Sequence, residues 1–388
     1  MAFRKFQAGK IFTGAEFLDD DQVLITTEQG VIEVIIPESE AGDDIQKLNG
    51  IISPGFINCH CHMELSHMKG RIPEKTGLVD FVYKVVTERH HPDEEVLQAI
   101  ADAEDEMLRN GIVAVGDICN NALTIPQKQK GRLHYFNFIE ASGWLPSVSQ
   151  ARFERAKQLF DNFKLQTSSL KLSIVPHASY SVSNELWQLI QPFFDNKVAS
   201  IHNQETAFED EFFLHGSGDF TRMYELLKID NTHHQPTKRS SLQSYFDRLI
   251  RAESILLVHN TFTRQADIDH IRNHTSEILH HTFFCLCINA NQYIEDAVPP
   301  IELLRQNNCN MVLGTDSFAS NWSLSIADEI KTIRKYFPSI PLEEVLNWST
   351  LNGAKALEMD HILGSFEKGK KPGIICFDEN LDQIKAMI

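Results

Sequence analysis

The sequence lacks long apolar runs and has fewer basic than acidic residues. None of its apolar runs reaches the ~20 residues that a helix needs to cross a bilayer, and the segment Met1–Phe6 has no apolar core of the kind found in signal peptides. Among 388 residues, 36 Lys and Arg face 53 Asp and Glu, which gives a net charge of −17. Because nucleic acids and anionic membranes attract basic surfaces, we expect a cytoplasmic protein with neither a nucleic acid nor a membrane as its partner.

Cysteine is also scarce. The seven cysteines are odd in number and scattered along the chain, which favours reduced thiols over a disulfide framework. Cys285 and Cys287 have the spacing of a metal-binding pair, but they lie in the apolar run Thr282–Ile288, and we interpret that run as a buried strand. Fixed-period repeats and low-complexity segments are absent as well, and the length suits a large domain with a smaller one.

The two chain ends share a β-rich pattern. Residues 1–53 contain short strand-like runs separated by turn residues. Near the other end, a helix expected over residues 341–357 precedes a last strand-like run, Ile374–Phe377, which no helix follows. We therefore predict a small domain built from both ends of the chain, residues 1–53 and 358–388.

The middle of the chain, residues 54–357, has an α/β pattern. Apolar strand-like runs alternate with amphipathic segments such as Asp93–Arg109, which Pro92 precedes. Eight such alternations predict a (β/α)₈ barrel of the TIM type. The expected strands are Gly55–His60, Ile112–Asp117, His134–Glu140, Leu172–His177, Val198–His202, Ile255–His259, Thr282–Cys287 and Met311–Asp316.

Polar residues stand at or just beyond the ends of seven of these strands. They are His60 with His62, Asp117, Glu140, His177, His202, His259 and Asp316. The carboxyl ends of barrel strands open on one face, where active sites lie, and residues two apart on a strand point to the same side. A single His-x-His pair is often only a solvated strand end, but several histidines and an aspartate at these positions predict a metal centre.

Glu205 follows His202 by three residues, where the strand turns into its loop. A carboxylate there could reach over a metal without binding it, and could transfer protons to or from a reacting group. We interpret Glu209 and Glu211, in the same segment, as solvated loop residues.

These motifs together resemble the amidohydrolase superfamily, in particular its aminohydrolase branch of adenosine-type, S-adenosylhomocysteine and guanine deaminases and triazine chlorohydrolases. The resemblance extends from about residue 8 to residue 378 and implies that the small domain is a β-sandwich. The matching segments are Pro54–His62, Pro176-His177, His202-x-x-Glu205, Val258–Asn260, Gly314–Ser317 with Ser320-Asn321, Asn352–Leu357 and Gly364–Lys370.

The resemblance also implies the roles of the site residues. His60, His62, His202 and Asp316 would hold one divalent metal ion, zinc or iron. His259 would contact the hydrolytic water, Asp316 would accept its proton, and Glu205 would be the proton shuttle; His177, Glu64 and Asn321 would contact substrate, with loop capping as the alternative role of Glu64. Strand four ends in His177, where two-metal members carry a bridging lysine, and this favours a mononuclear site.

The expected activity is hydrolytic deamination of an aminopurine nucleoside, with ammonia released from a small-molecule substrate. His60–Ser66, Gly77–Phe81 and Glu205–Phe213 resemble a subgroup of aminofutalosine deaminases of menaquinone biosynthesis, which favours 6-aminodeoxyfutalosine. The alternatives are a guanine, adenosine or S-adenosylhomocysteine deaminase, a chlorohydrolase or amidase on another ring, and a non-catalytic metal-binding barrel.

The sequence leaves open which cation would bind an acidic substrate and what the longest barrel connection does. It also leaves open the oligomeric state, for which a homodimer is one option. An acidic substrate needs a cation, for which Lys69, Arg71 and Arg89 are candidates by sequence proximity. The segment Thr206–Glu253 is longer than a normal barrel connection. It is either part of a lid, with the loop Met63–Asp80, or an insertion whose aromatic residues pack locally.

Overall fold

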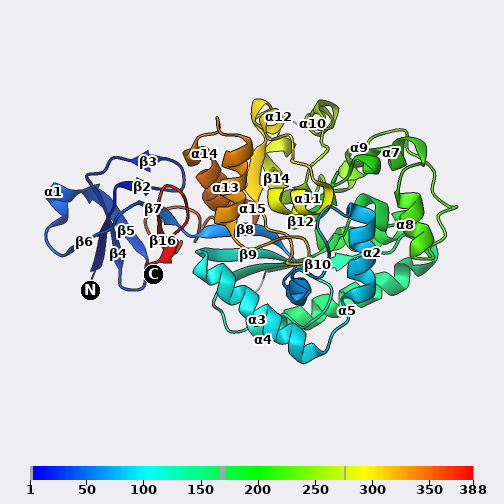
Figure 1. Cartoon of the computed structure of the whole chain (residues 1–388), viewed down its shortest axis with the longest axis horizontal. Coiled ribbons are helices and arrows are strands. Elements are labelled where there is room, and N and C mark those ends of the chain that lie inside the picture. Colours follow the sequence, from blue (N-terminus) through cyan, green and yellow to red (C-terminus); the bar gives the residue numbers. More distant parts are fainter. Residues whose placement is uncertain (1–2, 167–170, 275–276, 388) are drawn as a thin grey trace.

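The computed structural model describes residues 3–166, 171–274 and 277–387. Figure 1 shows a β-rich unit, which contains both chain ends, beside a larger unit of strands surrounded by helices. The β-rich unit has one sheet in the order β5-β4-β1-β6 and a second in the order β17-β16-β7-β2-β3. Their bounds are β1 Phe3–Gln7, β2 Lys10–Phe12, β3 Phe17–Leu18, β4 Gln22–Thr27, β5 Ile32–Pro37, β6 Ile45–Lys47, β7 Ile51–Pro54, β16 Ile374–Phe377 and β17 Lys385–Ala386.

The two ends of the chain meet through β16. This strand has the bounds that its sequence predicts, and it pairs antiparallel with β7, placing Ile375 opposite Ser53. Apolar residues from both sheets, including Phe6, Leu24, Ile52 and Ile374, form one buried cluster. The β-rich unit therefore contains strands from both chain ends, while the boundaries near residues 53 and 358 stay a prediction.

All eight predicted barrel strands are present, and they pair in parallel as two four-stranded sheets, β11-β10-β9-β8 and β12-β13-β14-β15. Residues two apart, such as Leu256 and Val258, share one buried cluster, whereas Leu257 between them belongs to another. The strands are thus buried on both faces, as in an α/β barrel. The strands are β8 Phe56–Cys61, β9 Ile112–Cys119, β10 His134–Ala141, β11 Lys171–Pro176, β12 Val198–Asn203, β13 Ser254–His259, β14 Thr282–Leu286 and β15 Asn310–Leu313.

The two sheets meet at two seams. At one seam the backbone N–H groups of Thr315 and Asp316 donate to His60 O, and Cys61 bridges Asp316. At the other, the N–H of His202 donates to His177 O, and Ala178 bridges His202. Both seams therefore lie at carboxyl strand ends that carry predicted site residues.

The helices cover the outside of these strands (Figure 1). The helix predicted over Asp93–Arg109 is α3, which has these bounds; Glu94 and Glu95 in its first turn complement the helix dipole. The helix predicted over residues 341–357 continues through a π-helical turn, Trp348–Asn352. The further helices are α2 Leu78–Glu88, α4 Ile125–Lys128, α5 Ser149–Gln166, α6 Asn184–Ile190, α10 Gln265–Arg272, α11 Ile288–Glu295, α12 Ile301–Gln306, α13 Ile326–Tyr336, α14 Leu342–Asn347 and α15 Gly353–Ala356.

The long segment between β12 and β13 forms α7 (Ala207–His215), α8 (Phe220–Leu226), α9 (Ser241–Tyr245) and the 3₁₀ turn η5 (Phe246–Arg248). Helix α8 contacts α2, and Phe212, Phe213 and Phe220 lie in a buried cluster with Leu78. These aromatic side chains therefore pack against one another and against the start of α2, whereas Tyr224 reaches the wall of the large pocket described below. Within the part of the chain that the structure describes, no helix is both long and apolar enough to cross a membrane.

Candidate active site

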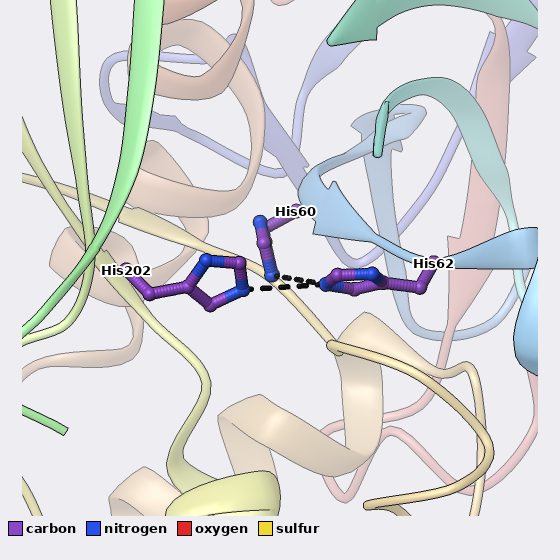
Figure 2. A group of neighbouring side chains, drawn as sticks. All are labelled: His60, His62 and His202. Carbon is purple, nitrogen blue, oxygen red and sulfur yellow. Dashed lines mark hydrogen bonds between the residues drawn. The ribbon is translucent and has the colours of Figure 1, made fainter. Parts of the chain in front are cut away.

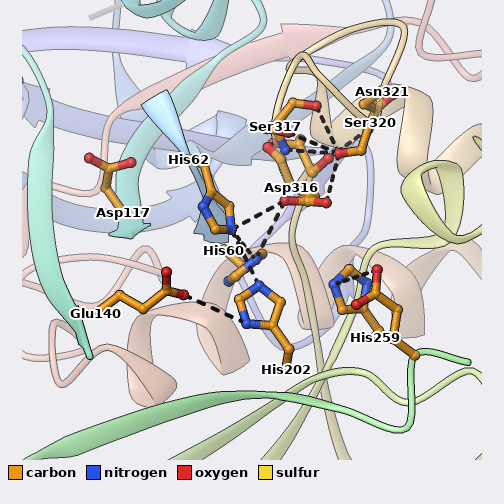
Figure 3. Close-up of polar contacts among 12 residues, drawn as sticks. His60, His62, Asp117, Glu140, His202, His259, Asp316, Ser317, Ser320 and Asn321 are labelled. Atoms are coloured by element: carbon orange, nitrogen blue, oxygen red, sulfur yellow. Dashed lines mark hydrogen bonds and ion pairs between the residues drawn. The ribbon is translucent and has the colours of Figure 1, made fainter. Parts of the chain in front are cut away.

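Three imidazoles converge at the carboxyl ends of the strands. His60 and His62 come from the end of β8 and His202 from β12, and their rings point toward one another (Figure 2). The Nε2 atom of His62 lies 3.2 Å from His60 Nε2 and 3.3 Å from His202 Nε2. Asp316, just after β15, places Oδ1 3.4 Å from His62 Nε2 and 3.7 Å from His60 Nε2 (Figure 3).

These distances fit a single metal ion. Ligand atoms of a tetrahedral zinc site lie ~3.3 Å apart, because the bonds from zinc to nitrogen and oxygen are about 2.0–2.1 Å long. Burial lowers the pKa of His60, His62 and His202, and so favours the neutral imidazole that binds metals. The three histidine nitrogens, with Asp316 Oδ1 beside His60 and His62, therefore form a candidate metal site with suitable spacing and protonation.

Partners behind the ligands fix their orientation. The Nδ1 atom of His202 donates to His177 O at 2.8 Å, which leaves its Nε2 lone pair facing the centre. Asp316 Oδ2 accepts a hydrogen bond of 2.7 Å from the Ser320 hydroxyl. Burial opposes ionisation of Asp316, but its contact with His60 and the nearby His62 and His259 outweigh burial and hold its pKa below the usual range.

Glu205 lies beside this centre and is buried. Its Oε1 is 3.6 Å from His259 Nε2. Burial raises the pKa of Glu205 well above its usual value, and the charges of Asp316 and Glu295 raise it further. Burial therefore favours the protonated, uncharged form of this carboxyl group.

Glu209 is not the solvated loop residue that its sequence context suggested. It is fully buried in the first turn of α7, where Oε2 accepts the backbone N–H of Glu205 at 3.2 Å. Its Oε1 accepts hydrogen bonds from the hydroxyls of Ser241 (2.5 Å) and Ser179 (3.1 Å), and burial raises its pKa to about 8. The two serines are 32 and 30 residues away in the chain, so local sequence could not reveal that Glu209 supports Glu205.

His259 ends β13 in the left-handed region, with φ of 74°. Its Nδ1 lies 2.8 Å from Asn291 Oδ1 on α11, so this nitrogen is the donor. Its Nε2 is buried without a hydrogen-bond partner among the described residues. Nε2 is thus a free acceptor facing Glu205, and Asn291, which no motif indicated, sets this tautomer.

A pocket of about 460 Å³ opens onto these groups. Of the predicted substrate residues, His177 and Glu64 line it, together with Glu205, His259 and Asp316. Asn321 is not among the described residues that line the pocket. Its side-chain amide donates hydrogen bonds to Thr315 O (2.7 Å) and Glu329 Oε1 (2.9 Å). The structure therefore places Asn321 behind the loop that carries Asp316, away from the pocket surface.

Glu64 has a capping role and also faces the pocket. Its Oε2 accepts the backbone N–H groups of Asn120 (2.9 Å) and Asn121 (3.1 Å) in the loop after β9. Burial raises its pKa to about 7, against the effect of the Asn120 hydrogen bond. Glu140 lies nearby, and its buried Oε1 has no hydrogen-bond partner among the described residues. The two roles considered for Glu64 are therefore compatible.

Of the three cations that sequence proximity suggested, Arg89 alone is among the described residues that line the pocket. Arg89 lines the pocket, whereas Lys69 pairs with Glu106 (3.4 Å) and Arg71 with Glu95 (2.6 Å). Arg152, on α5, lines the pocket as well. It lies 90 residues beyond His62 in the chain, and no pattern around it pointed to the site.

Asp117 supports the segment that carries His62. Its Oδ1 accepts the backbone N–H of Met63 at 2.9 Å, directly after His62. Its Oδ2 pairs at 2.5 Å with Lys128, and both side chains are completely buried. This strand-end carboxylate therefore anchors the ligand loop through a buried ion pair.

Comparison with known proteins agrees with this geometry. The model of the amidohydrolase family matches residues 51–388. The chain belongs to the amidohydrolase family. It is 25% identical over 338 residues to an adenosine deaminase of Helicobacter pylori, which covers 86% of this chain and 80% of that protein.

Two solved structures have the same fold. The aminofutalosine deaminase of Helicobacter pylori in complex with methylthio-coformycin has a TM-score of 0.80 and 22% identity, with 97% of this chain and 92% of that chain covered. An adenosine deaminase of Xanthomonas campestris with bound zinc has a TM-score of 0.71 and 20% identity over 96% and 84% of the two chains. The two structures confirm the predicted fold, and the family model confirms the predicted amidohydrolase family.

Proposed function

We propose that the protein is a mononuclear, metal-dependent deaminase that hydrolyses the exocyclic amino group of an aminopurine nucleoside. The observation that carries this proposal is the buried Glu205 beside three converging histidine nitrogens and the Asp316 carboxylate in a large pocket. A binding protein has no need of such an acid, whereas hydrolytic deamination needs one to protonate the ring.

The residues divide the chemistry among them. When bound, a divalent metal would supply a Lewis acid that makes water nucleophilic at neutral pH. The ionised carboxylate of Asp316 accepts the proton of the attacking water, and His259 Nε2 accepts a hydrogen bond from the same water. Glu205 gives its proton to the ring nitrogen next to the amino-bearing carbon. The proton held by Asp316 then passes to the amino group, ammonia leaves, and the hydroxyl group formed from water returns its proton to Glu205 as the carbonyl forms.

Within this class we propose 6-aminodeoxyfutalosine as the preferred substrate. The similarity to the Helicobacter pylori aminofutalosine deaminase supports this choice. So does the pocket, because Arg89 and Arg152 line it and neither guanidinium has an ion-pair partner among the described residues. An acidic substituent far from the reacting ring would find a cation there.

The test is a panel of aminopurine nucleosides and bases assayed with metal-loaded protein. Loss of the adenine absorbance band should match ammonia release, with the highest kcat/KM for 6-aminodeoxyfutalosine. Arg89→Met should raise KM for this substrate and leave adenosine unaffected, whereas Arg71→Met, a control outside the pocket, should change neither.

Faster turnover of adenosine, methylthioadenosine or S-adenosylhomocysteine would assign the protein to that substrate instead, in line with its adenosine deaminase relative. Turnover of guanine or a chlorotriazine alone would overturn the choice of an aminopurine nucleoside. Metal-loaded protein without activity on any of these compounds would contradict the proposed reaction itself.

A further inference from the structure

A second cluster of histidines and a carboxylate lies far from the pocket. His270, in the last turn of α10, and His274 are four residues apart, and both face Asp247 of the 3₁₀ turn η5. His274 Nε2 lies 2.9 Å from Asp247 Oδ1 and 3.4 Å from His270 Nε2. The distance from His270 Nε2 to Asp247 Oδ1 is 3.4 Å.

This triangle repeats the spacing of the catalytic centre. There the Nε2 atom of His62 lies 3.2 Å and 3.3 Å from its two histidine neighbours, and 3.4 Å from Asp316 Oδ1. Both sets approach the ~3.3 Å between ligand atoms around tetrahedral zinc. Two imidazoles and one carboxylate are also a donor set that suits zinc.

The side chains of the cluster are partly fixed in place. His270 and His274 are 22% and 23% exposed, whereas Asp247 is 57% exposed, so solvent reaches the triangle from one side. The ring of His274 packs 5.7 Å from the buried Phe246. Arg272, between the two histidines in sequence, donates instead to Asn307 Oδ1 at 2.7 Å. The two imidazoles would thus need little ordering to bind a metal, and Arg272 is directed elsewhere.

We propose that Asp247, His270 and His274 form a second metal site, which binds Zn²⁺ with water in its fourth position. The site is separate from the catalytic one. Turn η5 precedes β13, and the end of α10 leads into β14, so the triangle lies at the amino ends of these strands. In a barrel this is the face opposite the active site, and its residues contribute to stability.

The bound ion links the end of the long segment that precedes β13 to α10. An ion that binds the folded state and not the unfolded chain raises the Tm with its concentration. The physical consequence of the site is therefore a zinc-dependent stabilisation that does not involve catalysis.

The test counts bound zinc by equilibrium dialysis at micromolar free Zn²⁺, followed by elemental analysis. Wild-type protein should bind one ion more per chain than the double variant His270→Ala/His274→Ala. The matched control is His280→Ala/His281→Ala, because these two exposed histidines lie close by in the chain and outside the triangle. It should bind as much zinc as the wild type.

Further measurements keep the proposal falsifiable if the double variant folds poorly. Asp247→Asn keeps the shape of the side chain and both histidines, and should weaken the second zinc equilibrium by tenfold or more. Wild type should show a zinc-dependent rise in Tm beyond that of Asp247→Asn, and crystals should show an anomalous zinc peak at the triangle. Equal zinc binding by the wild type and both variants, or the same rise in Tm in all of them, would overturn the proposal whether or not the protein is a deaminase.

Discussion

Glu205→Gln is the substitution that tests the proposed reaction most directly. Glutamine keeps the size of the side chain and cannot supply the proton. The backbone N–H of residue 205 would still donate to Glu209 Oε2, and the predicted ligands His60, His62, His202 and Asp316 would be unchanged. We therefore expect a folded protein that retains its metal.

The expected loss of activity follows from the protonation of Glu205. Burial raises the pKa of Glu205 well above its usual range, which favours the protonated form that a general acid needs. The substitution then removes the whole effect of a general acid, about 10²–10⁴-fold in kcat, or roughly 3–5 kcal/mol of transition-state stabilisation. Wild-type activity should also fall as the pH rises through the raised pKa of Glu205, and this alkaline decline should be absent from the variant.

The measurement is kcat on the best nucleoside of the panel, together with metal content for each preparation. Glu211→Gln is a matched control, because Glu211 follows Glu205 closely in the chain, lies in α7 and is exposed. It should behave like the wild type. Loss of metal together with activity in Glu205→Gln would show that Glu205 is a ligand, and a kcat within about threefold of wild type would refute its role as the acid.

Three further predictions concern the surroundings of the site. His62→Ala and His202→Ala should each lose the catalytic ion and nearly all turnover, as elemental analysis and the ammonia assay would show. Lys128→Met should lower the free energy of unfolding by about 3–5 kcal/mol in denaturant titrations, because it leaves Asp117 charged, buried and unpaired, and adding Asp117→Asn should restore part of the loss. Glu209 has a pKa of about 8 in the folded protein; between its unfolded value near 4.5 and pH 8 the folded state binds more protons, so its contribution to stability falls by up to about 1.4 kcal/mol per pH unit as the pH rises. Glu209→Gln should remove that slope from the unfolding free energy measured across this range, and an unchanged slope would contradict the buried carboxyl.

The sequence predicts the barrel well because its signals are local. Each strand is an apolar run of period two or a fully buried run, and the ligands stand at strand ends where chain order alone places them. Asn291, Glu209 and Arg152 could not be found this way. Each meets the site through a contact between distant segments, and an asparagine, a glutamate or an arginine in a helix has no pattern that distinguishes it from a solvated residue.

The four predicted metal ligands come from both four-stranded sheets of the barrel. A metal site formed by them would therefore require both sheets. His60 and His62 belong to the sheet β8–β11, whereas His202 and Asp316 belong to the sheet β12–β15 or follow it directly. The two sheets meet at the same residues, through the bridges of Cys61 with Asp316 and of Ala178 with His202. Neither sheet alone offers more than two of the ligands, so the unfolded chain and either half-barrel would bind a metal weakly. A metal bound by these four residues would therefore stabilise the contact between the two sheets at the carboxyl ends of their strands, where the proposed chemistry takes place.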